Sequence, residues 1–516
     1  MILTTHIRRL APLAVAMLAA MIAPAAHAGL LAPKTIDAGT GKDSGEVGAA
    51  IGNHRAWAAF VQETGGVKRL YAEAAHNGRW AHPFLADRGN EVQLAGLAGS
   101  GRGRAVLVFT EKVGGKEVLF GRRLANGAGG PVDRISAAGE DVRSDPLNAH
   151  GARGNGVVMD DAGAAAVCYR DAVSQKPMLA TLAAGASQWV EHPVASDCLD
   201  LVIDARGDVV SVGTDGQKLF ASKIVNGQSS TETIGNAMDE PSVAISPSGL
   251  AIALVRDNNF HVVAFRKRDV TSNSPWESLG RVDSDTVFDN GDSPEEPRAT
   301  LDANGNGVIV WHSNSMNDAK TAYNIIRTGQ PATAKFLSKE ATDSFPYATT
   351  IATGMPAVGF ELPGGKTGLF TFRAGVPSAP LTLAPAIAPT VLNSAAGLVG
   401  DGKGNLVVLL FAGQNPIRTV AVFGDFGRPG LKPRAPHKVH ARKRVTLTSG
   451  ATDTFADPRP NQVRWTLPRG VRALAGTHGL KLRVRFARKG RYTIRLTVTD
   501  LGGNTHTATL RVKVRR

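Results

Sequence analysis

One short phrase recurs along the first four-fifths of this 516-residue chain, and the repeat constrains the fold more than any other feature of the sequence. Each copy follows a turn, usually with Gly, and is a mostly apolar run that often ends on an aromatic residue or Val. Successive copies end 42 to 60 residues apart, with a mean of about 50. The eight copies are residues 57–60, 105–109, 165–169, 209–213, 251–255, 307–311, 356–360 and 406–411.

Each copy belongs to a larger unit, in which an earlier apolar run, a tight turn of Gly, Asn or Ser, and two later runs accompany it. Four short strands in about 50 residues, repeated eight times, are typical of propeller blades, whereas a tandem of β-sandwiches needs about 100 residues a domain. We therefore expect an all-β chain with an eight-bladed β-propeller over residues 29–427. Seven blades is the alternative, because the copy at 209–213 is the least typical. Residues 30–425 resemble secreted bacterial propeller-repeat proteins.

The N-terminus has the pattern of a secretory signal peptide over residues 1–28. Arg8 and Arg9 precede an apolar, Ala-rich run, which closes on Ala26-His27-Ala28, a sequence that signal peptidase favours. No later apolar stretch approaches the 18 or more residues that span a bilayer. We expect a secreted protein, extracellular or associated with the cell surface, that begins at Gly29.

The formal net charge of +15 is distributed very unevenly. Residues 431–516 hold 21 Lys and Arg but only Asp453, Asp457 and Asp500, a net charge of +18, while residues 29–430 carry −5. Solubility of a small domain needs a net charge of only about 2–8, and unshared like charge destabilises the compact state. The C-terminal charge therefore indicates an anionic partner, although an Arg-rich soluble surface is the alternative.

The C-terminal residues 438–516 follow a linker at 428–437, marked by Pro433 and Pro436. Five apolar runs without helical periodicity predict an Ig-like β-sandwich. The segment at 490–504, GRYTIRLTVTDLGGN, resembles the last strands of PKD (polycystic kidney disease repeat) domains. The other PKD hallmark, a WDFGDG-type segment, is replaced by WTLPRG at 465–470. The resemblance implies an extracellular spacer, adhesion or glycan-contact module without catalysis.

Two C-terminal segments alternate cationic and apolar residues with a period of two, KLRVRF at 481–486 and RVKVR at 511–515. This period sends the apolar residues into the core and the cations to the solvent. We expect one face of the sandwich to carry both strands and to bind a cell-envelope polyanion or an acidic polysaccharide. The residues predicted for this face are Lys481, Arg483, Arg485, Arg491, Arg495, Arg511, Lys513 and Arg515.

A metal site and a disulfide are the remaining candidates. Asp302, Asn304 and Asn306 have the oxygen spacing of a calcium loop, but position 12 of that loop is not an acid, and a plain hairpin turn is the favoured interpretation. We expect no cofactor, with calcium as the alternative. Cys168 and Cys198, the two cysteines of the chain, are expected at the same end of one blade and are predicted to form a disulfide, with two free thiols as the alternative.

The chain ends are expected to meet in the last blade. The eighth unit has no fourth strand of its own, and residues 31–37 resemble the fourth strand predicted at 379–384. We therefore expect residues 31–37 to supply the missing outer strand, which removes an open sheet edge.

The motif content favours binding over catalysis. A nucleophile elbow, an HExxH sequence, a Walker loop and a CxxC pair are all absent from the sequence. We expect a secreted non-catalytic binding or adhesion protein, with the propeller as recognition platform and the basic sandwich as anchor, and with no dedicated nucleic-acid binding. The alternative is a secreted polysaccharide hydrolase or lyase whose site lies in the propeller channel.

Overall fold

The computed structural model of the protein describes residues 29–39, 44–143, 156–284, 293–314, 320–337, 346–384, 390–391, 397–413 and 416–516. The predicted signal segment 1–28 lies outside the described residues. The described chain is built almost entirely from β-strands. It contains no helix of the length and apolarity that crossing a membrane requires.

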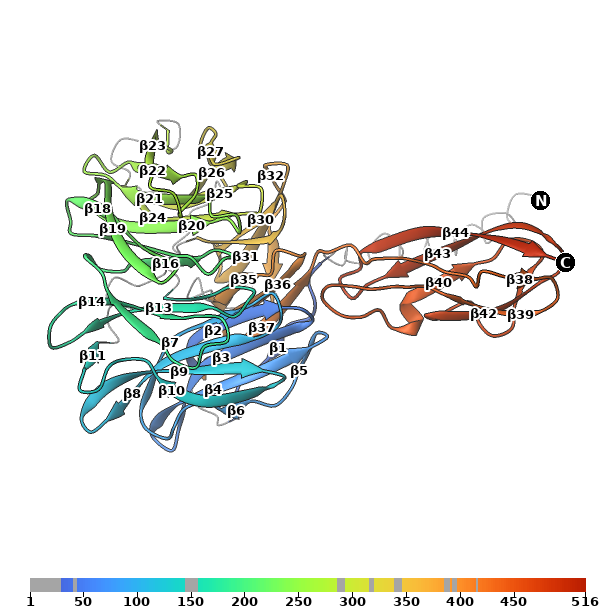
Figure 1. Cartoon of the computed structure of the whole chain (residues 1–516), viewed down its shortest axis with the longest axis horizontal. Coiled ribbons are helices and arrows are strands. Elements are labelled where there is room, and N and C mark those ends of the chain that lie inside the picture. The colour runs from blue at the N-terminus through green and yellow to red at the C-terminus, as the bar shows by residue number, and fades with distance from the viewer. Residues whose placement is uncertain are drawn as a thin grey trace, which may run out of the picture.

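Eight antiparallel sheets of four or five strands follow one another along residues 34–425, and their arrangement is that of a β-propeller (Figure 1). The first strand of each sheet is β2 (Ser44–Gly52), β7 (Val92–Gly99), β12 (Val157–Met159), β16 (Asp200–Ile203), β20 (Asp239–Ile245), β24 (Ser293–Leu301), β29 (Tyr347–Ala352) or β35 (Leu398–Gly400). The second strands are β3 (Arg55–Thr64), β8 (Ala105–Val113), β13 (Ala165–Asp171), β17 (Val209–Thr214), β21 (Ala251–Arg256), β25 (Gly307–Asn314), β30 (Met355–Leu362) and β36 (Asn405–Ala412).

The third strands are β4 (Val67–His76), β9 (Lys116–Ala125), β14 (Pro177–Leu182), β18 (Lys218–Val225), β22 (Val262–Lys267), β26 (Lys320–Arg327), β31 (Lys366–Arg373) and β37 (Arg418–Asp425). On them lie the outer strands β5 (Arg79–Trp80), β6 (Phe84–Leu85), β10 (Ala128–Arg134), β15 (Val190–Pro193), β19 (Gln228–Asn236), β23 (Glu277–Arg281), β27 (Gln330–Pro331), β28 (Lys335–Phe336), β32 (Val376–Pro377), β33 (Leu381–Leu383) and β1 (Lys34–Thr35). Two further short strands, β11 (Val142–Arg143) and β34 (Thr390–Val391), pair with the second strands of their sheets.

Each of the eight repeated phrases lies in the second strand of one sheet. These strands are apolar on both faces because each sheet packs against a neighbouring sheet on either side. In β21, for example, all six residues are buried. The repeat therefore marks a strand that is buried on both faces, which is why its apolar run is the clearest signal in the sequence.

The first strands stand side by side in a closed ring. Each contacts the first strand of the next sheet along the chain, from β2 and β7 through to β29 and β35. The ring closes because β35 and β36 of the last sheet contact β2 of the first.

The N-terminal segment completes the last sheet, which confirms the prediction for residues 31–37. β1 pairs antiparallel with β37, with Lys34 opposite Ala421 and Thr35 opposite Val420. Backbone hydrogen bonds from Leu31 N to Phe423 O (2.8 Å) and from Ile36 N to Thr419 O (3.0 Å) extend the pairing on both sides. The outer edge of β37 is thereby covered.

Residues 438–516 form two smaller sheets that extend from one side of the ring (Figure 1). The four-stranded C-terminal sheet has the order β38 (Val439–His440), β44 (Thr505–Arg515), β43 (Gly490–Thr499), β40 (Val463–Thr466). The three-stranded C-terminal sheet has the order β39 (Arg444–Thr448), β42 (Lys481–Phe486), β41 (Val471–Ala473). Side chains from both sheets share one core around the buried Trp465.

The segment predicted as a linker is attached to the three-stranded sheet. The backbone of Gly430 pairs with Thr452, and that of Arg434 pairs with Thr448 at the end of β39. This segment therefore lies beside β39 at the edge of the three-stranded sheet.

Candidate functional sites

The outer face of the three-stranded C-terminal sheet is a candidate anion-binding surface. In β42 the burial alternates strictly, which matches the period of two in the sequence. Lys481, Arg483 and Arg485 are exposed, whereas Leu482 and Val484 belong to the core.

One row of this face holds three guanidinium groups. Arg485 lies directly opposite Arg444 of β39 on one side and Arg472 of β41 on the other. All three residues are exposed. Like charges in directly opposite positions are destabilising. An anion that bridges the row would remove this repulsion.

The outer face of the four-stranded C-terminal sheet carries a second set of cations among threonines. Arg491 lies opposite Lys513, and Arg511 lies opposite Thr493. Arg495 lies between Thr509 and Thr466. The exposed cations of β43 and β44 are Arg491, Arg495, Arg511, Lys513 and Arg515.

The expectation of one basic face is therefore wrong, since the eight predicted cations are divided between two sheets. β42 pairs with β39 and β41, whereas β44 pairs with β43 and β38. Because the common core lies between the sheets, their charged faces look in opposite directions. A period of two determines which side chains point outward from a strand, but not the sheet to which the strand belongs.

The C-terminal cations have no acidic partners of their own. Within residues 428–516, all of which the structure describes, no Lys or Arg forms an ion pair with a described carboxylate. Two of the three acids there, Asp453 and Asp500, are buried, and only Asp457 is exposed. The positive charge of both faces is therefore uncompensated within the described chain.

The candidate calcium loop is a hairpin turn whose aspartate is already engaged by backbone groups. One oxygen of Asp302 accepts hydrogen bonds from Asn304 N (2.8 Å) and Asn306 N (2.9 Å). The other accepts from Gly354 N of the next sheet at 2.7 Å. Asp204 and Asp401 hold the equivalent turns of sheets four and eight in the same way. The arrangement is that of a repeated turn rather than of a metal loop.

Cys168 and Cys198 are joined in a disulfide, with a Cα–Cα distance of 5.9 Å. Cys168 lies in β13, and Cys198 lies in the connection that follows β15 and leads to β16. The disulfide therefore links the segment between β15 and β16 to β13, the second strand of the third sheet.

Carboxylates of the first strands hold neighbouring sheets together. Glu46 of β2 accepts a hydrogen bond from Leu94 N (2.6 Å) of β7, and Glu240 of β20 accepts one from Glu296 N (2.7 Å) of β24. Burial raises the pKa of both Glu46 and Glu240 above its usual range. These hydrogen bonds join the first strands of neighbouring sheets in the ring.

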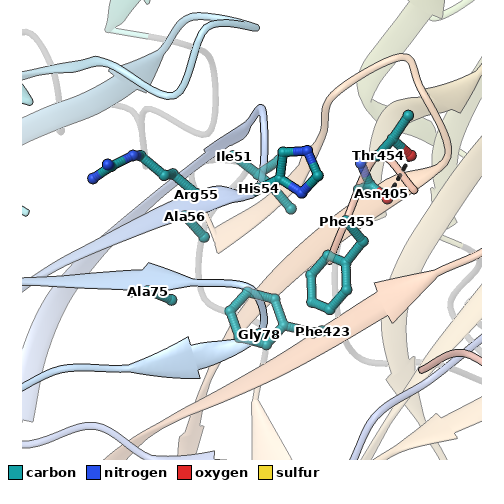
Figure 2. A pocket seen from close by; sticks show the side chains of 10 residues that line it. All are labelled: Ile51, His54, Arg55, Ala56, Ala75, Gly78, Asn405, Phe423, Thr454 and Phe455. Atoms are coloured by element: carbon teal, nitrogen blue, oxygen red, sulfur yellow. Dashed lines mark hydrogen bonds between the residues drawn. The ribbon is translucent and has the colours of Figure 1, made fainter. Parts of the chain in front are cut away.

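The C-terminal sheets are docked on the ring through a loop that follows β39 (Figure 2). Phe455, which is 4% exposed, lies edge-on to Phe423 of β37 with ring centroids 5.2 Å apart. Thr454 donates a hydrogen bond to Lys403 O at 3.2 Å. A Cβ atom on Gly78 would approach the Phe455 ring to 2.9 Å, so the close fit requires glycine there. The pocket beside these rings has room for about one water molecule.

Three aspartates converge at this junction, although no sequence motif marks them. Asp425 ends β37 in the propeller, Asp453 lies in the docking loop, and Asp500 opens the turn between β43 and β44. All three are buried, and one carboxylate oxygen of each lies within 4.8 Å of those of the other two. The scarcity of acids in residues 431–516 was the one sequence signal that pointed to this cluster, because two of the three acids there belong to it.

Burial and mutual repulsion disfavour the charged forms of these acids. They raise the pKa of Asp425 to about 8, with burial the largest cause and the charges of Asp453 and Asp500 next. Burial also raises the pKa of Asp453 and of Asp500. A cation bound among the three carboxylates would favour their ionised forms and lower these pKa values.

Comparisons with known proteins find only distant structural similarities. No protein-family model and no curated protein matches the chain. A protein of unknown function from Dyadobacter fermentans is 10% identical over 77% of this chain and 98% of that chain, with a TM-score of 0.35. The β-propeller domain of the Trilobed protease from Pyrococcus furiosus is 10% identical over 67% of this chain and 99% of that chain, with a TM-score of 0.39. Polysaccharide lyase Uly1 is 11% identical over 62% of this chain and 88% of that chain, also with a TM-score of 0.39. The assignment of the fold rests on the sheet topology and not on these similarities.

Proposed function

We propose that the protein is a secreted, non-catalytic binding protein that is anchored through its basic C-terminal domain to an anionic extracellular polymer. The polymer is a cell-envelope polyanion or an acidic polysaccharide, and the propeller is the recognition platform. The observation that carries the proposal is the pair of exposed cationic faces without described acidic partners. Arg predominates on both faces, and its planar guanidinium suits carboxylate and phosphate groups.

We infer that each of the eight sheets is one propeller blade. The closed contacts from β2 to β35 and back to β2 support eight, because a seven-bladed ring would leave one sheet outside. The sheet that contains residues 209–213, the least typical copy, takes its place in the ring between β12 and β20.

We also assign an Ig-like fold to residues 438–516. Supporting features are the buried Trp465 in β40 and the hydroxyl of Tyr492, which donates to Arg488 O at 2.9 Å near the start of β43. The second contact matches the tyrosine corner of such domains. The parallel pairing of β38 with β44 and the edge at 430–434 agree with this topology. The PKD-like segment at 490–504 supplies β43 and the turn that begins at Asp500.

The test is the salt dependence of binding to a polyuronate and to polyphosphate, with the chain of residues 29–516. We expect binding that weakens steeply as salt rises, because each ion contact releases counterions. Replacement of Arg483, Arg485, Arg511 and Arg515 by Ser is expected to flatten the slope. The matched control replaces four exposed cations of the propeller, Lys68, Arg102, Lys112 and Lys366, by Ser and is expected to leave the slope unchanged.

Two results would contradict the proposal. Absence of binding to either polyanion at low salt would exclude the anchor role. An equally large change of the salt slope in the control variant would show that binding depends on net charge alone. Shortening of the polyuronate during incubation would instead favour a hydrolase or lyase.

A further inference from the structure

The acidic cluster at the domain junction combines two independent features of a cation site. The first is convergence, because oxygens of Asp425, Asp453 and Asp500 lie within 4.8 Å of one another. The second is that each residue contributes one buried oxygen without a hydrogen-bond partner, namely Asp425 Oδ1, Asp453 Oδ2 and Asp500 Oδ2. The three residues are only 0%, 7% and 5% exposed, so bulk water does not solvate these atoms.

The other oxygen of each carboxylate is held in place by the backbone. Asp453 Oδ1 accepts from Phe455 N at 2.8 Å, and Asp500 Oδ1 accepts from Asn504 N at 2.8 Å. Asp425 Oδ2 accepts from Gly502 N at 3.3 Å. The carboxylates are thus oriented in advance, with one oxygen of each left free, which is the arrangement that a preorganised ligand set requires.

No described side chain neutralises the cluster through an ion pair. No Lys or Arg of the described chain lies within ion-pair distance of any of the three carboxylates. The neighbouring titratable groups are His54, whose charge would favour ionised Asp453, and Asp457, which opposes it. If ionised, these buried carboxylates would repel one another, and a cation bound among them would remove that repulsion.

We propose that Asp425, Asp453 and Asp500 bind one divalent cation, Ca²⁺, which links the last sheet of the propeller to the C-terminal domain. An all-oxygen, carboxylate-rich set suits a hard cation. Ca²⁺ binds oxygen at about 2.3–2.6 Å, so two of its ligands lie at most about 5 Å apart, which agrees with the spacing here. Asp425 comes from the propeller and the other two from the C-terminal sheets. The ion therefore holds the basic domain in one orientation on the ring.

A second source of positive charge lies nearby and provides the competing explanation. The backbone of Gly29 donates to Gly502 O at 2.8 Å and accepts from Asp425 N at 2.5 Å. Under the proposed secretion, cleavage after Ala28 would place the α-ammonium group of Gly29 at this junction. In that case the cluster would need no metal.

The experiment uses the chain of residues 29–516 after removal of metals with EGTA, titrated with CaCl₂ and, separately, with MgCl₂ in a calorimeter. We expect one Ca²⁺ per chain and a rise in Tm of about 3–8 °C at 100-fold excess over Kd. Asp425→Asn and Asp500→Asn are each expected to weaken Ca²⁺ binding at least tenfold. Asp215→Asn is the control, because Asp215 is an exposed acid of the propeller outside the cluster, and its Ca²⁺ affinity should be unchanged.

Several results would overturn the proposal. A stripped chain that binds no Ca²⁺ and melts at the same temperature with and without it would assign the neutralising charge to the chain itself. Binding that survives both cluster substitutions would place the ion elsewhere. Mg²⁺ that binds as tightly as Ca²⁺ would overturn the assignment to calcium. The titration of the unsubstituted chain decides the first point even if a variant fails to fold.

Discussion

The side-chain amide of Asn504 donates a 2.8 Å hydrogen bond to the backbone carbonyl oxygen of Asp425. Asn504 closes the turn between β43 and β44, whereas Asp425 is the last residue of β37. The contact joins this turn of the C-terminal sheets to the strand that also accepts the N-terminal segment. The closure of the ring and the docking of the C-terminal sheets therefore depend on the same strand.

Loss of the N-terminal strand should destabilise the propeller. Deletion of residues 29–38 uncovers the edge of β37 and is expected to lower Tm markedly. Ile36→Ala is the milder variant, because Ile36 is 1% exposed, and it should lower the free energy of unfolding by about 2–5 kcal/mol. Thr35→Ala, at the neighbouring exposed position in β1, is the control and should change little. Unchanged denaturation curves for the deletion would show that β1 does not close the ring.

Phe455→Ala should weaken the docking of the C-terminal sheets. The substitution empties the space between Phe423 and Gly78, and removal of a buried Phe costs about 3–5 kcal/mol. We expect differential scanning calorimetry to resolve a separate, lower transition for the C-terminal sheets. Leu474→Ala, at a residue that is 38% exposed, is the control and should melt like the unsubstituted chain. A single unshifted transition for Phe455→Ala would argue against a docking role.

The stability of the ring should fall as the pH rises through the range in which Glu73 ionises. Glu73 of β4 is 2% exposed, and burial raises its pKa from 4.5 to about 7, although Lys34 of β1 lies 3.6 Å away. Because the folded state holds the proton more tightly, the contribution of Glu73 to stability is fully present below about pH 4.5 and is lost as the pH rises to about 7. The free energy of unfolding, measured with denaturant, should be compared between the unsubstituted chain and Glu73→Gln. The difference between the two should change by on the order of 1–3 kcal/mol across this pH interval. A difference that is constant with pH would contradict the shift.

Relief of repulsion on the three-stranded C-terminal sheet should stabilise it. Arg485→Thr removes the central charge from the row with Arg444 and Arg472, and a gain of about 0.2–1 kcal/mol is expected at low salt. The gain should shrink in high salt, because surface charges are then screened. Lys481→Thr is the control, since Lys481 lies opposite Thr448 rather than another cation. Equal effects of the two substitutions would show that the row has no special repulsion.

The disulfide should contribute measurably to stability. It closes a loop with a sequence separation of 30, for which loop-closure entropy predicts about 3–4 kcal/mol. The double variant Cys168→Ala and Cys198→Ala should unfold at lower denaturant concentration by a corresponding amount. Thiol titration of the unfolded, unreduced chain should detect no free thiol, and two reactive thiols per chain would refute the bond.

The local alternation and the repeat could be predicted because they depend on neighbouring residues alone. A strand buried on both faces is mostly apolar, and each of the eight phrases lies in a strand most of whose described residues are buried. A strand with one solvent face must alternate, and Leu482 and Val484 are indeed core residues while Arg483 is exposed. The outer strand from residues 31–37 was predictable because the eighth unit lacked a strand that closure of the sheet requires.

Other features depended on contacts between segments far apart in the chain. β42 and β44 have nearly the same alternation, yet they belong to different sheets, because the pairing partners of a strand are chosen by core packing rather than by its own pattern. Asp425, Asp453 and Asp500 carry no mutual spacing signal, and each has the local appearance of an ordinary turn or strand-end residue. The sequence therefore determined the strands, their outward faces and the basic charge. The tertiary structure decided which cations share a face and which acids share a site, because contacts between residues tens of positions apart leave no local periodicity in the sequence.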